Sequence, residues 1–255
     1  MHIFVVKKAT IIRAAVFLLL VIGAIVYAQA AIGEAAPASA QAEAMPVCRI
    51  QTDEMIVAVT FDTVFGDEDY TRQILDVLKS ESVRATFFVM GLWANENSAA
   101  LDAILRGGHE IASHSMNHER YPDMTQSEIL SDAKAAADVI FSKTGYDTRL
   151  IRMPYGAFDT PSILALESEG FLPVKWSVDS KDWKGYSAEQ IADSVMADVQ
   201  NGDIIMFQNN MAQTPAALIE IILALRERGY KIVTVSDLLF DSDYIIDAKG
   251  VQRPL

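Results

Sequence analysis

The sequence predicts an α/β protein, an irregular (β/α)7 barrel placed after an N-terminal apolar segment. Two observations indicate this fold class. Short apolar runs alternate with segments that carry helix-capping signals, and about seven such pairs follow one another along the chain. This alternation is typical of a parallel sheet covered by helices, in which functional side chains gather at the carboxyl ends of the strands.

The chain begins with an apolar stretch that predicts export. Residues 14–27 are almost wholly apolar, and no charged residue lies between Arg13 and Glu34. This uncharged stretch is about as long as a helix that spans a bilayer. Lysine and arginine but no acidic residue precede it, so the rest of the chain is expected outside the cytoplasm. Residues 1–33 are therefore predicted to be a signal anchor that holds the protein at the membrane. The small residues around Gln29 also fit signal-peptide cleavage, and secretion is the alternative.

The rest of the chain divides by composition. Residues 34–49, rich in Ala, Pro, Ser and Glu, are expected to be a linker, residues 50–240 the folded domain, and residues 241–255 a C-terminal tail. Cys48 is the only cysteine, so no intrachain disulfide can form and no disulfide partner is evident. The formal net charge of -13 disfavours nucleic acid as a partner and favours a neutral substrate.

Within the domain, periodicity and capping signals predict the elements. Strands are expected at 55–61, 85–90, 110–113, 150–153, 171–176, 203–207 and 231–235. Helices are expected at 69–79, 98–106, 125–145, 160–170, 187–202 and 214–229. Two of them begin with capping boxes, Thr125-x-x-Glu128 and Ser187-x-x-Gln190, and two begin with a Thr-Pro pair, at Thr160 and at Thr214.

Polar and aromatic residues follow the expected strands. They are Asp62, His114 with His118, Arg152 to Gly156, Asp179 with Asp182 and Trp183, and Gln208 to Asn210. Because parallel strands bring their carboxyl ends to one end of a barrel, these side chains are expected to form one site. The two histidines are four residues apart, so one turn of helix or a tight loop brings both rings to the same side, where zinc can bind.

These residues fall into motifs, namely Thr60-Phe61-Asp62, His114-Ser115-x-x-His118, Arg152-x-Pro-Tyr-Gly156, Asp179-Ser-x-Asp182-Trp183 and Gly202-x-Ile-Ile. In order and spacing they resemble the motifs of the polysaccharide deacetylase family with the NodB homology domain. The resemblance covers residues 50–240 and implies the irregular barrel of that family. It is closest to sporulation-associated and membrane-anchored members, which share an opening seen here as Phe61 to Glu68.

The resemblance implies metal-assisted removal of N-acetyl groups from an amino-sugar polymer such as peptidoglycan or chitin. Asp62 would be the general base, and His114 with His118 would hold a divalent metal, usually Zn²⁺. Arg152, together with Asp179 or Asp182, would orient the base and the acid. The leaving amine needs a proton from an acid, because an amide anion is a very poor leaving group.

Two residues depart from the family pattern. Thr63 stands where the family has a second, metal-binding Asp, so Asp62, Asp67, Glu68 or water would have to complete the metal shell. Gln208 stands where the family has the acid histidine, and glutamine cannot transfer a proton at accessible pH. A buried, protonated Asp179 or Asp182 is the candidate replacement.

Two functions are consistent with this pattern. The first is an exported, metal-dependent deacetylase of cell-wall or spore-cortex glycan, impaired by Thr63 and Gln208. The second is a catalytically degenerate glycan-binding or morphogenetic protein on the same fold. Tyr155 and Asn209 are candidate substrate-binding residues, although Asn209 and Asn210 could instead cap the next segment. Trp183 either stacks on sugar or packs in the core, and His109 is expected to be structural.

Overall fold

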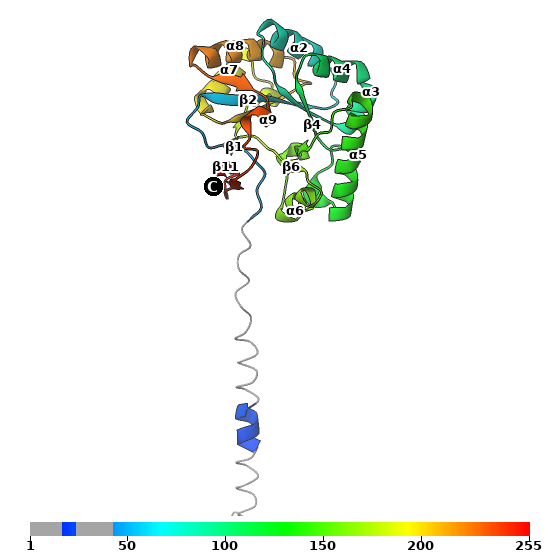
Figure 1. Ribbon diagram of the computed structural model, residues 1–255, viewed down its shortest axis with the longest axis vertical. Coiled ribbons are helices and arrows are strands. Elements are labelled where there is room, and N and C mark those ends of the chain that lie inside the picture. Colours follow the sequence, from blue (N-terminus) through cyan, green and yellow to red (C-terminus); the bar gives the residue numbers. More distant parts are fainter. Residues whose placement is uncertain (1–16, 24–42) are drawn as a thin grey trace, which may run out of the picture. The chain divides into compact units, whose positions relative to one another are not determined.

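The computed structural model describes residues 17–23 and 43–255 (Figure 1). Residues 43–255 belong to one compact unit. Residues 17–23 are helical, and among the described residues no helix combines the length and the apolar character that a membrane crossing requires. Apart from residues 17–23, the predicted signal anchor lies outside the described residues, and so does most of the predicted linker.

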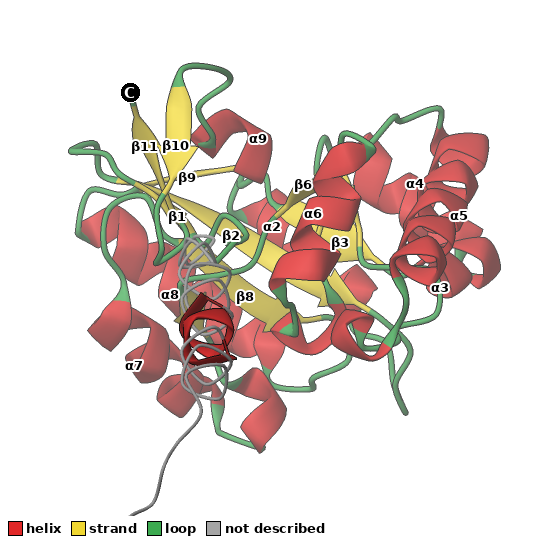
Figure 2. Cartoon of the chain, turned by 90° about the horizontal axis from the view of Figure 1, so that it is seen from below, coloured by secondary structure: helices red, strands yellow, loops and turns green. Residues whose placement is uncertain are grey.

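The centre of the compact unit is an eight-stranded parallel sheet (Figure 2). Its strands run in the order β6, β5, β4, β3, β2, β8, β7, and β9 pairs with the first residues of β2. Their bounds are β2 (Ile56–Thr63), β3 (Thr86–Val89), β4 (Glu110–Ser113), β5 (Leu150–Ile151), β6 (Leu172–Pro173), β7 (Val178–Asp179), β8 (Ile204–Gln208) and β9 (Lys231–Val233). Every pairing among them is parallel, which confirms the predicted α/β class.

The sheet curls into a half-barrel, whereas the sequence predicts a (β/α)7 barrel. Within residues 43–255, β6 and β7 stand at the two ends of the strand order and do not pair with each other. The segment from Val47 to Ile50 lies along the open side. Val47 exchanges backbone hydrogen bonds with Pro173 and Lys175, and Ile50 donates to the carbonyl of Gly202. These bonds satisfy backbone groups that barrel closure would otherwise have to pair.

Helices cover the outer face of the sheet. They are α2 (Thr71–Ser80), α3 (Gly91–Glu96), α4 (Ser98–Arg106), α5 (Gln126–Thr144), α6 (Thr160–Ser168), α7 (Ala188–Asp198), α8 (Thr214–Glu227) and α9 (Val235–Leu238). Side chains alternate along β2, so Val57, Val59 and Phe61 join the core beneath the helices. The same alternation places Thr60 and Asp62 on the inner face, and this is why the strand delivers a carboxylate to the inside of the half-barrel.

Both predicted capping boxes are present, and both predicted Thr-Pro pairs stand at the start of a helix. Thr125 with Glu128 and Ser187 with Gln190 form complete capping boxes at the start of α5 and α7. Asp159 rather than Thr160 caps α6, because Thr160 is already its first helical residue. Thr214 is likewise the first residue of α8, and its hydroxyl donates to a buried carboxylate instead of capping the helix.

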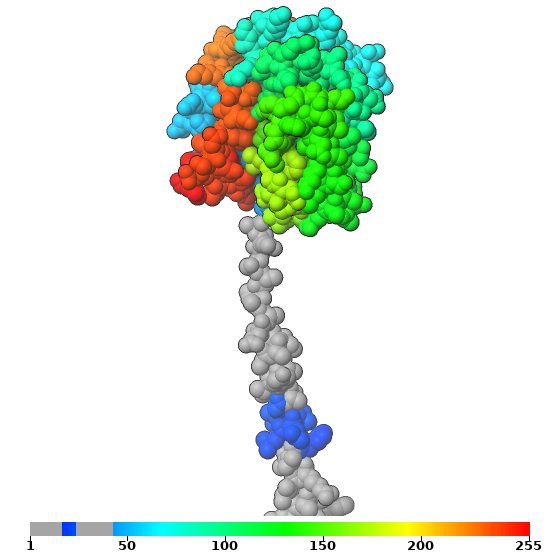
Figure 3. Space-filling view, turned by 45° about the vertical axis from the view of Figure 1, so that its right-hand side comes forward, coloured from blue at the N-terminus to red at the C-terminus, as the bar shows by residue number. Residues whose placement is uncertain are grey.

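The C-terminal residues pack onto the same unit. β10 (Tyr244–Ile246) and β11 (Val251–Pro254) form a three-stranded sheet with β1 (Arg49–Ile50), in which β1 and β11 are parallel. The amide of the fully buried Gln252 exchanges hydrogen bonds with the backbone of Phe240. Figure 3 shows this segment in red, lying against the body of the unit. Residues 241–255 thus pair with the first strand of the compact unit and pack against it.

Candidate active site

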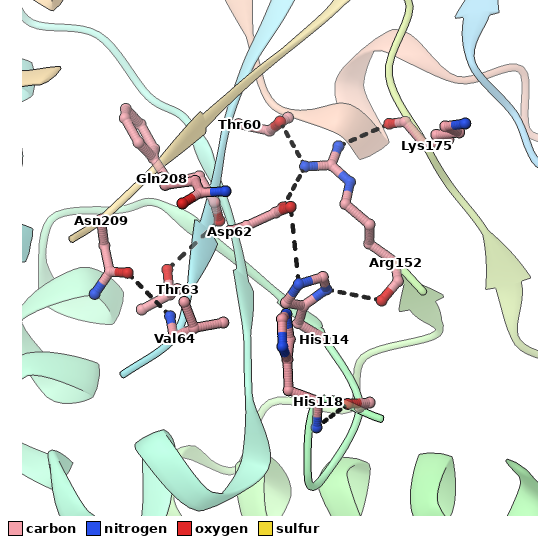
Figure 4. A network of polar contacts seen from close by, with 12 residues as sticks. Thr60, Asp62, Thr63, Val64, His114, His118, Arg152, Lys175, Gln208 and Asn209 are labelled. Carbon is pink, nitrogen blue, oxygen red and sulfur yellow. Dashed lines mark hydrogen bonds and ion pairs between the residues drawn. The ribbon is translucent and has the colours of Figure 1, made fainter. Parts of the chain in front are cut away.

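Asp62 and Arg152 form a buried ion pair at the inner face of the sheet (Figure 4). Nη1 of Arg152 donates to Oδ1 of Asp62 at 2.6 Å and to the hydroxyl of Thr60 at 2.9 Å, and Nη2 donates to the carbonyl of Lys175 at 2.7 Å. The guanidinium is fully buried, with its central carbon 3.8 Å from the centre of the Phe88 ring. These contacts fix the guanidinium, and the guanidinium in turn fixes the carboxylate.

His114 presents one ring nitrogen to the second oxygen of Asp62. Its Nδ1 lies 2.8 Å from the backbone carbonyl of Arg152. A carbonyl only accepts, so Nδ1 carries the proton and Nε2 keeps its lone pair. Nε2 lies 3.8 Å from Oδ2 of Asp62. Burial lowers the pKa of His114 despite the nearby Asp62 carboxylate, so the ring is neutral and its Nε2 is available to a metal.

His118 lies beside His114 because a tight loop reverses the chain between them. The ring centres are 5.0 Å apart, and both Ser115 and His118 adopt positive φ, 66° and 62°. The His118 amide donates to the hydroxyl of Ser115 at 2.8 Å. Burial, followed by the neighbouring His114 ring, lowers the pKa of His118 to about 4. The predicted pairing of the two imidazoles on one side is therefore present.

Asp132 on α5 secures this loop, and sequence reasoning missed it. Its buried carboxylate accepts backbone N–H bonds from Met116 at 2.9 Å and from Asn117 at 3.2 Å, and the Tyr121 hydroxyl at 2.8 Å. The available sequence signal was an acidic residue directly before Ala133, on the apolar face of an otherwise amphipathic helix. Thr60 belongs to a predicted motif, but its role in orienting Arg152 was not predicted, and Trp176, which lines the cavity, was missed as well.

A cavity of about 640 Å³ opens over these groups. It is lined by Asp62, Val64, Phe65, Met90, His114, His118, Tyr155, Trp176, Asp179, Trp183, Met206, Gln208 and Asn210. Tyr155 is 64% exposed at its edge, with its ring centre 4.6 Å from that of His118. Aromatic faces beside a few polar groups suit a sugar, whose ring offers both apolar faces and hydroxyls.

Asp179 and Trp183 line the cavity together. The indole N–H of Trp183 lies 3.3 Å from one oxygen of Asp179 and 3.4 Å from the other, and the amide of Lys181 donates to the same carboxylate. Trp183 is 48% exposed, so it belongs to the cavity wall and not to the core. Asp179 is therefore an accessible carboxylate inside the cavity.

Asp182 lies behind Gln208 and does not line this cavity. Its Oδ2 accepts the backbone N–H of Gln208 at 2.8 Å and the Thr214 hydroxyl at 2.7 Å. Its Oδ1 is buried and has no hydrogen-bond partner within the described part of the chain. Burial raises the pKa of Asp182 to about 6, although these hydrogen bonds act in the opposite direction. Gln208 itself ends β8 and lines the cavity.

Asn209 does not reach the cavity, which corrects its placement as a substrate-binding residue. It is fully buried, its side-chain oxygen accepts the N–H of Val64 at 2.9 Å, and its amide nitrogen donates to the Thr71 hydroxyl at 3.2 Å. All of its polar side-chain atoms are thus used to hold the loop after β2. Asn210 lines the cavity in its place.

The metal-ligand set is incomplete in protein side chains. In residues 17–23 and 43–255, no group of three or more His, Cys, Asp or Glu side chains is arranged to hold a metal ion. Thr63 is fully buried, and its hydroxyl donates to the Phe61 carbonyl at 3.4 Å. The residues that fit a divalent cation are His114 and His118, with Oδ2 of Asp62 close to His114.

Comparison with known proteins identifies the class. The family model described as polysaccharide deacetylase matches residues 49–174. A peptidoglycan-N-acetylglucosamine deacetylase of Bacillus cereus is 34% identical over 195 residues, which cover 74% of this chain and 91% of that protein. The peptidoglycan-N-acetylmuramic acid deacetylase PdaC of Bacillus subtilis is 32% identical over 189 residues, which cover 74% of this chain but only 40% of that protein.

Solved structures give the same result. Peptidoglycan deacetylase PdaC from Bacillus subtilis superposes with a TM-score of 0.65 at 33% identity, over 74% of this chain and 92% of that one. BA3943 from Bacillus anthracis, a CE4 family pseudoenzyme, superposes with a TM-score of 0.73 at 26% identity, over 82% of this chain and 73% of that one. The chain belongs to the polysaccharide deacetylase family, also called CE4, with its NodB homology domain.

Proposed function

We propose that this protein is an extracytoplasmic, metal-dependent deacetylase that removes N-acetyl groups from an amino-sugar polymer of the cell wall or spore cortex. Peptidoglycan is the favoured substrate, since two of its relatives carry that activity in their names. The observation that carries the proposal is Asp62, fixed by Arg152 and directed at His114 inside an aromatic cavity.

Asp62 is suited to be the general base. Its Oδ1 is occupied by the Arg152 guanidinium, whereas its Oδ2 has only the more distant His114 nitrogen, at 3.8 Å. Oδ2 can therefore take the proton of a water molecule that attacks the acetyl carbonyl. A divalent cation such as Zn²⁺, held through His114 and His118, would supply polarisation of that carbonyl when bound.

Protonation of the leaving amine is the weak step. Gln208 occupies the wall where a donor is needed and can only offer a hydrogen bond. Asp179 lines the cavity together with Asp62, and Asp182 carries the raised pKa but lies behind Gln208. We propose that the amine receives the proton that Asp62 takes from the attacking water, with turnover slowed by the missing histidine.

The second candidate function is glycan binding without turnover. Thr63 and Gln208 support it, because they remove one metal ligand and one proton donor from the pattern of the family. A relative of similar fold, BA3943, is itself a pseudoenzyme. The cavity with Tyr155, Trp176 and Trp183 would then serve as a binding groove.

One experiment separates the two candidates. The full chain, loaded with Zn²⁺, is incubated with N-acetylglucosamine oligomers and with peptidoglycan, and both acetate release and binding are measured beside an Asp62→Asn control. Release by the wild type but not by the control supports the deacetylase. Binding without release supports the glycan binder, and neither binding nor release contradicts both.

We further propose that residues 1–33 anchor the protein at the outer face of the membrane. The support is the apolar stretch with its basic flank. Cell fractionation with an antibody against the folded domain tests this proposal. Recovery of the full-length chain in the membrane fraction is expected, and a shortened chain in the medium would show secretion instead.

A further inference from the structure

A second cavity, of about 840 Å³, lies between α2, α4 and the start of β4. Figure 1 shows α2 and α4 as neighbouring helices at the top of the view. Its lining shares no residue with the cavity over Asp62, so it is a separate site. Its floor is apolar, built from Leu75, Leu78, Val83, Ala100 and Ala103.

His109 provides a hydrogen-bond donor at the base of this cavity. The residue is only 6% exposed, and its Nδ1 accepts the backbone N–H of Ala85 at 3.3 Å. A neutral imidazole that accepts at Nδ1 carries its proton on Nε2. Within residues 43–255, Nε2–H has no hydrogen-bond partner. Burial lowers the pKa of His109 to about 4, so the ring is neutral at pH 7. The bond from Ala85 then fixes which of its two nitrogens carries the proton.

Gly107 lies directly beside the donor edge of the ring. A Cβ atom at position 107 would lie 2.7 Å from Nε2 and 2.6 Å from Cδ2 of His109. The backbone of Gly107 has φ -70°, which any residue can adopt, so the local conformation does not require glycine. Glycine is therefore needed here because any side chain at position 107 would collide with the ring.

The rim of the cavity is basic although the protein is acidic. Arg72, Lys79, Arg84 and Arg106 line it, against Asp76 as the one lining acid. Arg84 and Arg106 already pair with Asp237 and Asp102, whereas Arg72 and Lys79 have no acidic partner among the described residues. On a chain with a formal net charge of -13, this is a local site for a negative group.

We propose that this cavity binds a medium-chain fatty carboxylate. The carboxylate accepts the Nε2–H of His109 and lies among the cations of the rim, while the alkyl chain covers the apolar floor. A donor at the base of a cavity of this volume is accessible to the end of a small molecule and not to a folded partner. The proposal is independent of deacetylation, because the two cavities are separate.

The test is a titration of octanoate into the full chain held in phosphatidylcholine nanodiscs. Calorimetry gives the affinity, and the ¹⁵N shift of the His109 ring reports whether Nε2–H gains an acceptor. Acetate, which lacks the alkyl chain, and octanamide, which lacks the charge, are titrated in parallel. We expect saturable binding of octanoate alone, with a shift of the His109 signal.

Two variants test the assignment. Lys79→Glu should weaken octanoate binding by about tenfold or more, since it replaces an attractive charge with a repulsive one. Lys249→Glu, an equal change of charge at an exposed turn, should leave the affinity unchanged. Gly107→Ala should close the ring edge and abolish the His109 shift. Octanamide binding equal to octanoate, equal loss in both charge variants, or no saturable binding would overturn the proposal.

Discussion

At the scale of single residues, Asp62 depends on Arg152. Replacing Arg152 with Met leaves a carboxylate in a nearly buried position without its cation, together with unpaired groups on Thr60 and Lys175. We expect a loss of about 3–5 kcal/mol in the free energy of unfolding, measured by urea denaturation. The double variant Arg152→Met/Asp62→Asn should lose less than Arg152→Met alone. An equal loss would show that the charge of Asp62 is not the cause.

In the proposed reaction, we expect Gln208 to limit the rate. Gln208→His places an imidazole in the cavity wall, at a residue whose backbone N–H donates to Asp182, and the buried Oδ1 of Asp182 has no partner within the described residues. If the amine lacks a good proton donor, acetate release should rise by about a hundredfold or more. Gln208→Asn is the control and should bring no gain. The gain should also disappear when Asp182→Asn is added, and its persistence there would contradict the pairing.

Asp182 should make stability depend on pH. Its pKa in the folded protein, about 6, is above the ordinary value of 3.8, so the folded state binds the proton more tightly than the unfolded state. The stabilising effect of that proton is complete below pH 4 and is lost as the pH rises through 6. Relative to wild type, Asp182→Asn should therefore gain about 2 kcal/mol of unfolding free energy between pH 4 and pH 7. Urea denaturation at several pH values measures this difference, and parallel curves would contradict it.

At the scale of elements, α5 supports the loop that carries the two histidines. Its capping box fixes the start of the helix, and its Asp132 holds the amides of Met116 and Asn117. The element thus supports both imidazoles through the backbone of their loop. Positive φ at Ser115 and His118 makes this loop costly to form, so external hydrogen bonds are needed to keep it.

Asp132→Asn tests this support. Asparagine offers one acceptor oxygen where two backbone amides and the Tyr121 hydroxyl are now bound. The zinc affinity of the full chain should fall by about 10–100-fold, as measured by calorimetry. Asp138→Asn, an exposed change on the same helix, is the matched control and should leave the affinity unchanged. Equal zinc affinities of the two variants would show that Asp132 does not support the metal-binding loop.

At the scale of the whole molecule, the first and last segments of the compact unit are paired with each other. β1 pairs with β11, and the segment around Val47 bonds to the edge of β6. Gly250 permits this contact, because a Cβ atom there would lie 2.6 Å from both the Pro46 carbonyl oxygen and the Sγ of Cys48. The C-terminal residues therefore contribute to the stability of the domain that carries the site.

Gly250→Ala should destabilise the protein more than Gly145→Ala does. Both glycines have positive φ, 75° and 70°, so both substitutions carry a backbone cost of about 1–2 kcal/mol. Only at Gly250 does the new methyl group also collide with neighbours, whereas nothing lies within 4 Å at Gly145. Thermal and urea unfolding measure both losses. Equal losses of stability would show that the segment of Pro46 and Cys48 moves aside without a cost in free energy.

Local patterns in the sequence determined the class of fold and most of the site. Alternation along the strands and capping at the helices depend on neighbouring residues, so the parallel α/β architecture and the gathering of Asp62, His114, His118 and Arg152 could be predicted. The tertiary structure decided the open side of the half-barrel, the burial of Asn209 and the support from Asp132. These features depend on hydrogen bonds between segments far apart in the chain, and such bonds leave no periodic trace in the sequence.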